Sequence, residues 1–203
     1  MEKLDLFKEL KAEYNKSKKP NIIETTSANY LTVTGIGAPA GEEYTAKVSA
    51  LYAVAFPLKM NSKKHDKDYV VSKMEGLWWA DEASEWDFLD VPRERWQWKM
   101  IIRTPDFISQ PDVDSIIEMQ IKKKKELPIA EVTYEEINEG LCVQALHVGP
   151  YADETPLIRS MHELATDEGY EFHGLHHEIY LSDPRKVDPS KLKTILRHPI
   201  RIK

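Results

Sequence analysis

A glutamate flanked by a histidine and a tyrosine stands in a predicted strand near the C-terminal end of the sequence. Alternate residues of a strand share one face, so His176, Glu178 and Tyr180 lie together, opposite the more apolar face of Ile179 and Leu181. Burial raises the pKa of a carboxylate towards the range useful for a general base. We therefore predict Glu178 and Tyr180 as catalytic residues and His176 as a substrate-binding residue. The alternative for Glu178 is a buried structural carboxylate paired with an arginine.

Aromatic residues are the second feature that could bind a ligand, because the faces of Trp and Tyr hold flat rings well. The predicted substrate-binding rings are Trp78, Trp79, Trp86, Trp96, Trp98 and Tyr151. For Trp96 and Trp98, which alternate with polar residues on one predicted strand, ordinary core packing is the alternative. Trp78 and Trp79 point to opposite strand faces unless Gly76 introduces a bulge. Trp86 lies in an acidic, irregular stretch and is predicted to act as a lid.

A weak internal repeat indicates how these residues are positioned. A strand, a glycine turn and a helix occur at residues 32–37 and again at 145–149. A glutamate lies mid-strand in both halves, at Glu75 and Glu178, and residues 101–105 mirror residues 195–199. Glu75 is therefore predicted as a further substrate-binding residue, with a structural pairing to Lys73 or Arg103 as the alternative.

Each half of the repeat reads as β-α-β-β, which predicts an α+β fold with pseudo-twofold symmetry. Two such units joined edge to edge form one antiparallel sheet with the helices on one face. We expect a ligand groove on the other face, near the pseudo-twofold axis. The apolar face of the last repeat's strand should meet the helices, and the face of Glu178 should open into the groove.

Composition excludes several classes of function. The 203 residues carry a formal net charge of −6, which argues against nucleic acid as a partner, because phosphate binding needs a positive surface. The lysine run at residues 122–125 is interpreted as a solvated helix end. Cys142 is the single cysteine, so no internal disulfide can form. No signal peptide or membrane-spanning run is recognised, so we expect a cytoplasmic location and no membrane partner.

No metal or other cofactor is expected from the sequence. The histidines between His173 and His177 lack the helical spacing of metal ligands, and His176 and His177 face opposite ways on a strand. Gly35 and Gly37 lack the further glycine and the lysine of a phosphate-binding loop.

Several of these segments resemble one known family. Residues 176–184, 196–200 and 147–151 resemble the end of GyrI-like small-molecule-binding domains and the entry to their second helix. The segments 69–79 and 96–105, with their tryptophans, resemble a stand-alone subfamily that includes cyclopropanoid cyclopropyl hydrolases. The resemblance implies two β-α-β-β units and a ligand-binding glutamate at Glu178. The charged N-terminal residues, with their short helical pattern, are predicted to form a helical appendage (1–24). The rest of the chain is then the GyrI-like domain (25–203), made of a first unit (25–108), a connecting helix (109–138) and a second unit (139–203).

The function that the resemblance implies is binding of aromatic or polycyclic xenobiotics. The subfamily likeness extends this to hydrolysis of electrophilic cyclopropanoid DNA-alkylating compounds, with Glu178 positioning water inside an aromatic cage, and thus to xenobiotic detoxification. The alternative is a module that binds or sequesters drugs without chemistry. A third interpretation is a protein-binding inhibitor of a DNA enzyme such as gyrase.

Overall fold

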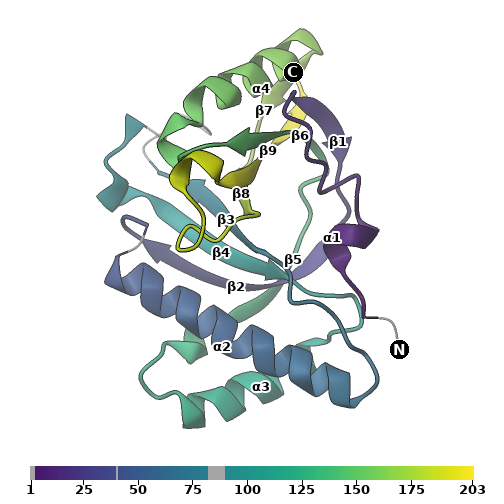
Figure 1. Ribbon diagram of the computed structural model, residues 1–203, viewed down its shortest axis with the longest axis vertical. Helices are drawn as coiled ribbons and strands as arrows, with labels where there is room; N and C mark the ends of the chain where they lie inside the picture. Colours follow the sequence, from purple (N-terminus) through teal and green to yellow (C-terminus); the bar gives the residue numbers. More distant parts are fainter. Residues whose placement is uncertain (1–2, 40, 82–89) are drawn as a thin grey trace.

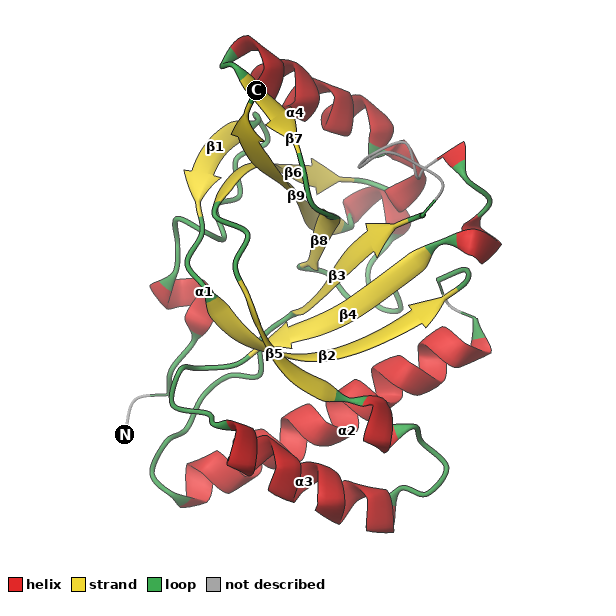
Figure 2. Cartoon of the chain, turned by 180° about the vertical axis from the view of Figure 1, so that it is seen from behind, coloured by secondary structure: helices red, strands yellow, loops and turns green. Residues whose placement is uncertain are grey.

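The computed structural model describes residues 3–39, 41–81 and 90–203. The described residues form a nine-stranded antiparallel sheet in the order β1-β6-β9-β8-β3-β4-β2-β5, with β7 paired to β9 (Figures 1 and 2). The first repeat supplies β2 (Ala28–Ile36), α2 (Glu42–Lys64), β3 (Met74–Trp79) and β4 (Gln97–Arg103). The second supplies β6 (Leu141–Val148), α4 (Thr155–Asp167), β7 (Tyr170–Phe172), β8 (His176–Tyr180) and β9 (Lys193–Ile202). The α+β class and the tandem β-α-β-β arrangement are thus confirmed.

The two repeats join through their middle strands. β3 pairs with β8, with Glu75 opposite Ile179 and Gly76 opposite Glu178. The unbroken register between β3 and β4 shows that Gly76 forms no bulge. The pseudo-twofold axis therefore passes close to Glu178, the predicted catalytic residue.

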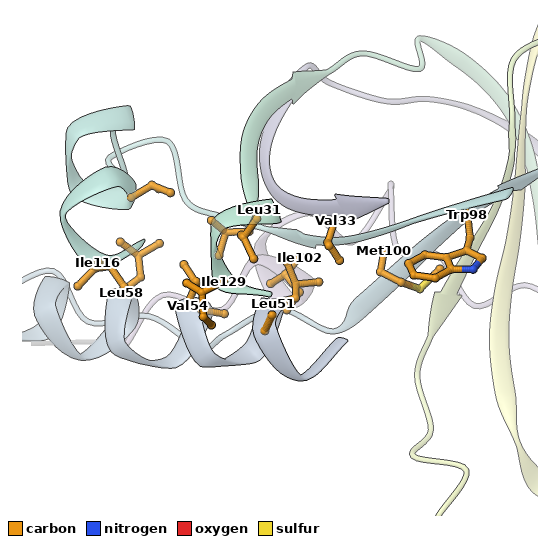
Figure 3. Packing of buried hydrophobic residues seen from close by; sticks show 14 of the residues in the cluster. Leu31, Val33, Leu51, Val54, Leu58, Trp98, Met100, Ile102, Ile116 and Ile129 are labelled. Atoms are coloured by element: carbon orange, nitrogen blue, oxygen red, sulfur yellow. The ribbon is translucent and has the colours of Figure 1, made fainter. Parts of the chain in front are cut away.

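The long helix α2 covers the first repeat. Its apolar stripe includes Leu51, Val54 and Leu58, which pack on Leu31 and Ile102 of the sheet (Figure 3). A shorter helix, α3 (Gln110–Lys123), packs beside α2 and adds Ile116 to the same core. These side chains are almost completely buried, and each such burial contributes about 1.5–3 kcal/mol.

Helix α4 covers the second repeat on the same side of the sheet. Its buried residues Ile158 and Met161 pack against Val143, Ala145 and Leu196 of β6 and β9. Figure 1 shows α4 and α2 at opposite ends of this face, with β8 between them. No helix in the described part of the chain is long and apolar enough to cross a membrane.

The opposite face of the sheet is covered by the N-terminal segment rather than left open. The short helix α1 (Leu6–Glu9) and the residues that follow it place Phe7, Leu10 and Tyr14 against Ile179 and Ile195. The predicted orientation of the last repeat was therefore wrong. The apolar face of β8 meets the N-terminal segment, and the face of Glu178 lies on the helix side.

Strand edges also differ from the sequence prediction. β1 (Asn21–Glu24) and β5 (Thr133–Ile137) extend the sheet at its two ends and were not predicted. Tyr69 forms only an isolated bridge to Leu4, and β3 itself begins at Met74. Before α4, Asp153 ends a 3₁₀ turn (Tyr151–Asp153), and Glu154 occupies the N-cap position of the helix.

Candidate functional site

Glu178 lies in the middle of the sheet, between the two covering helices. Its strand neighbours are Gly76 of β3 and Leu196 of β9. Its side chain is 12% exposed, and one carboxylate oxygen lies 3.6 Å from Nε2 of the buried His176. The structure thus brings Glu178, His176 and Tyr180 together on one face, as alternation along the strand requires.

Aromatic rings form one wall beside Glu178. The indole of Trp78 donates a hydrogen bond to the Tyr180 hydroxyl, with 2.9 Å between Nε1 and the oxygen. Tyr151 meets Tyr180 edge to face, with ring centroids 6.0 Å apart. Tyr44 of α2, which the sequence analysis did not select, stacks over Trp78 at 6.3 Å and meets Trp98 edge to face at 5.1 Å. We call Tyr44, Trp78, Tyr151 and Tyr180 the ring wall.

The other tryptophans occupy different environments. Trp96 contacts Trp78 edge to face at 5.8 Å and donates its indole N–H to the carbonyl of Val91. Trp98 is completely buried under α2, as the core-packing alternative expected. Trp79 follows Trp78 on a regular strand, so its side chain points to the other face and is half-buried. Trp86 lies outside the described residues.

Glu154 is a second carboxylate at the site, and the sequence analysis missed it. Its side chain is 3% exposed, and its Oε1 has no hydrogen-bond partner among the described residues. Burial, and then the charge of Glu178, raise the pKa of Glu154 well above the usual range of a glutamate. No local signal could have found it, because a position one residue before a helix does not predict that the side chain turns towards β8.

The tyrosine hydroxyls of the ring wall are held in their neutral form. Burial, followed by the nearby charge of Glu178, raises the pKa of Tyr151 to about 12. The same two causes raise the pKa of Tyr44 and of Tyr180 still further above the ordinary value. These hydroxyls therefore act as hydrogen-bond donors near the carboxylates.

Two glutamates and a histidine at the site are side chains of the kinds that bind metal ions. In the described part of the chain, one such group was found: one ligand atom each from Glu154, His176 and Glu178, all within 4.8 Å of one another. Neither carboxylate forms an ion pair with a lysine or arginine of the described residues.

Glu75 is not part of this arrangement. It is completely buried on the opposite face of the sheet, where it accepts hydrogen bonds from the Tyr14 hydroxyl and from Nε2 of His177. The structural partners of Glu75 are therefore Tyr14 and His177, and not Lys73 or Arg103, which the sequence suggested. Because β3 and β8 run antiparallel, the residue that faces Glu178 across the junction is Gly76.

His177 connects Glu75 to a second buried acid, Glu139. The two ring nitrogens of His177 lie 2.9 Å from oxygens of the two carboxylates. Burial lowers the pKa of His177, but the two carboxylates outweigh it and raise the value to about 9. Burial raises the pKa of Glu139, yet His177 and Arg197 together lower it to about 2. This charge network supports the strand that presents Glu178.

A hollow of about 380 Å³ opens elsewhere, between α2 and α3. Its lining is mainly apolar, with Phe56, Met60 and Met119, and it carries Lys64 and Lys123 at its margin. Among the residues that the structure describes, no carboxylate or histidine lines it. The side chains that could take part in a reaction are gathered around Glu178 and not in this hollow.

Comparison with known proteins identifies relatives over the whole chain. Residues 111–201 match the GyrI-like small molecule binding domain. A crystal structure of an uncharacterized conserved protein from Listeria innocua has 38% sequence identity and a TM-score of 0.90, covering 98% of this chain and 100% of that one. A structure described as a hydrolase from Listeria innocua has the same identity and coverage and a TM-score of 0.87. The C-terminal domain of EcmrR shares the fold, with 12% identity, a TM-score of 0.55 and coverage of 91% and 98%. No curated protein matches the sequence.

Proposed function

Because the chain belongs to the family of GyrI-like small-molecule-binding domains, we propose that it binds a flat aromatic xenobiotic against the ring wall and hydrolyses it beside Glu178. The observation that carries this proposal is the position of a carboxylate at the edge of a cluster of rings, 12% exposed in the middle of the sheet. The description of a 38% identical relative as a hydrolase supports the catalytic part.

The proposed substrate class is cyclopropanoid DNA-alkylating compounds, in which a cyclopropane is joined to a conjugated dienone. Opening the ring makes the dienone aromatic, so the enzyme needs only to orient the substrate and a water molecule. The water oxygen bonds to the methylene carbon, a carbon–carbon bond of the cyclopropane breaks, and its electron pair moves to the carbonyl oxygen. Glu178 accepts the proton that the water loses, and the new phenolate takes a proton from solvent.

The ring wall and the neutral hydroxyls have separate roles in this proposal. Offset or edge-to-face contacts with aromatic rings contribute about 0.5–1.5 kcal/mol each beyond area burial, which favours a planar substrate. Tyr180, fixed by the indole of Trp78, positions the reacting groups next to Glu178. The same features suit a domain that binds drugs without reacting with them, which is the second candidate function.

The two candidates are separated by Glu178→Gln, which keeps the size of the side chain and removes its basicity. In an assay that follows loss of the dienone absorbance of a cyclopropapyrroloindole, we expect turnover by the wild type. We expect a decrease of roughly 10²–10⁴-fold in the variant, the usual contribution of a general base.

Asp183→Asn is the matched control. Asp183 lies on the loop after the same strand, and its carboxylate is paired with Arg185. This variant should retain full activity. Equal turnover by wild type and Glu178→Gln would contradict the proposed role of Glu178. Tight binding, measured by tryptophan fluorescence, without any turnover would establish the sequestering function instead.

A further inference from the structure

Glu154 and Glu178 lie close together, and among the described residues neither carboxylate forms an ion pair with a lysine or an arginine. A carboxyl group taken out of water needs an opposite charge or hydrogen bonds, or else it holds a proton and stays neutral. Elsewhere in the described chain this compensation is visible: Glu13 pairs with Arg103, and Glu139 pairs with Arg197 and His177. At Glu154 no such cation is present among the described residues, and Oε1 accepts no hydrogen bond from them.

The positions of Glu154, Glu178 and His176 indicate which positively charged group could bind between them. One oxygen of Glu154, one oxygen of Glu178 and a ring nitrogen of His176 all lie within 4.8 Å of one another. Ligand atoms at such separations can be bridged by a single metal ion. Two carboxylates and one imidazole are ligands that transition metals accept, zinc in particular.

We propose that Glu154, His176 and Glu178 form a binding site for a divalent transition-metal ion, with Zn²⁺ as the best fit. The ligands come from separate elements: Glu154 precedes α4, and the other two lie on the same face of β8. Three protein ligands with a fourth position left for water are the arrangement of zinc sites that are not purely structural. This site goes beyond the proposed function, because binding of the ion requires no substrate.

The test uses full-length, chelator-treated protein without a histidine tag, titrated with ZnCl₂ in a calorimeter. We expect one high-affinity ion per chain. Glu154→Gln and Glu178→Gln should each weaken binding by more than roughly ten-fold, because even residues that only support a metal ligand contribute that much. Asp183→Asn, the control carboxylate paired with Arg185, should bind as the wild type does. Circular dichroism confirms that each variant is folded.

A second measurement uses the wild-type protein alone and does not depend on the folding of variants. Long-range proton–nitrogen NMR spectra report the ring nitrogens of the seven histidines. Stoichiometric Zn²⁺ should shift the nitrogen resonance of one ring, and His176→Asn assigns it. No uptake of zinc, uptake that Glu154→Gln and Glu178→Gln leave unchanged, or a shift of a different histidine would each overturn the proposal.

The metal site and the proposed hydrolysis share Glu178 but are tested apart. The hydrolysis assay contains a chelator, and the zinc titration contains no substrate. Turnover without zinc binding therefore refutes only the metal site, and zinc binding without turnover refutes only the proposed hydrolysis.

Discussion

At the scale of single residues, Gly76 decides how closely the ring wall can assemble. A Cβ atom at this position would lie 2.8 Å from Trp78 Nε1 and 2.8 Å from the Tyr180 hydroxyl. It would also lie 2.7 Å from the end of Met100. The hydrogen bond between the indole and the hydroxyl therefore requires a glycine at position 76 of β3. The backbone of Gly76 does not have a positive φ, so the requirement is one of space alone.

Gly76→Ala should consequently destabilise the protein by about 1–3 kcal/mol, the usual cost of overpacking a filled core. Urea unfolding followed by tryptophan fluorescence measures the change. Tyr180→Phe removes one of the atoms in the way, so the double variant should lose less than the sum of the two single variants. Strict additivity would show that the close approach to Tyr180 does not determine the cost.

Residue-scale chemistry also explains why Glu154 escaped prediction. Aspartate is one of the residue types preferred at a helix N-cap, and Asp153 stands just before α4 in the sequence. The 3₁₀ turn before α4 shifts the helix start by one residue, so the cap position goes to Glu154, which makes no side-chain capping bond. Its side chain is left to lie against β8, and local sequence contains no signal for that contact.

At the scale of elements, the N-terminal segment is held to the sheet by a buried ion pair. Nη1 of Arg103 lies 2.7 Å from Oε2 of Glu13, and both side chains are about 5% exposed. Nη2 of Arg197 donates to the backbone carbonyl of Glu13 at 2.6 Å. The segment that the sequence predicted as an appendage therefore closes the second face of the sheet.

Glu13→Gln should destabilise the protein by about 3–5 kcal/mol, because removing one partner leaves the other charge buried and uncompensated. Chemical denaturation at neutral pH tests this. Glu171→Gln is the matched control: its partner Arg201 is 61% exposed, and surface pairs contribute only about 0–1 kcal/mol. Similar losses in the two variants would mean that the Glu13 pair does not hold the segment.

At the scale of the whole molecule, Glu139 connects strands from several parts of the chain. It follows β5 in sequence, and its carboxylate contacts His177 of β8 and Arg197 of β9. The pKa of Glu139 is lowered to about 2 from a model-compound value of 4.5. A carboxyl group whose pKa is depressed on folding stabilises the folded state above its unfolded pKa, and this stabilisation is lost as the pH falls towards the folded value.

The free energy of unfolding should therefore decrease between pH 4.5 and about 2, with this group contributing up to about 1.4 kcal/mol per pH unit. Urea denaturation at a series of pH values measures the slope. Glu139→Gln should be less stable at neutral pH and should show a shallower dependence over the same interval. An unchanged slope in the variant would assign the acid sensitivity to other carboxyl groups.

The sequence determined the tandem repeat, the α+β class and the face that Glu178 shares with His176 and Tyr180. Each of these follows from local spacing: period two along strands, the apolar stripe of α2, and a strand–turn–helix pattern that occurs twice. For Trp98 the sequence left two interpretations open, a substrate-binding ring and core packing, and its complete burial agrees with the second.

Only the tertiary structure decided which side of the sheet each face meets. Alternation separates two faces but carries no information about what covers them, and the N-terminal segment covers the face expected to meet the helices. It also decided that Gly76, not Glu75, lies opposite Glu178, since the antiparallel register of β3 and β8 is set by pairing between the repeats. The arrival of Glu154 and Tyr44 beside Glu178 depends in the same way on how α4 and α2 pack on the sheet, a long-range outcome that no local pattern encodes.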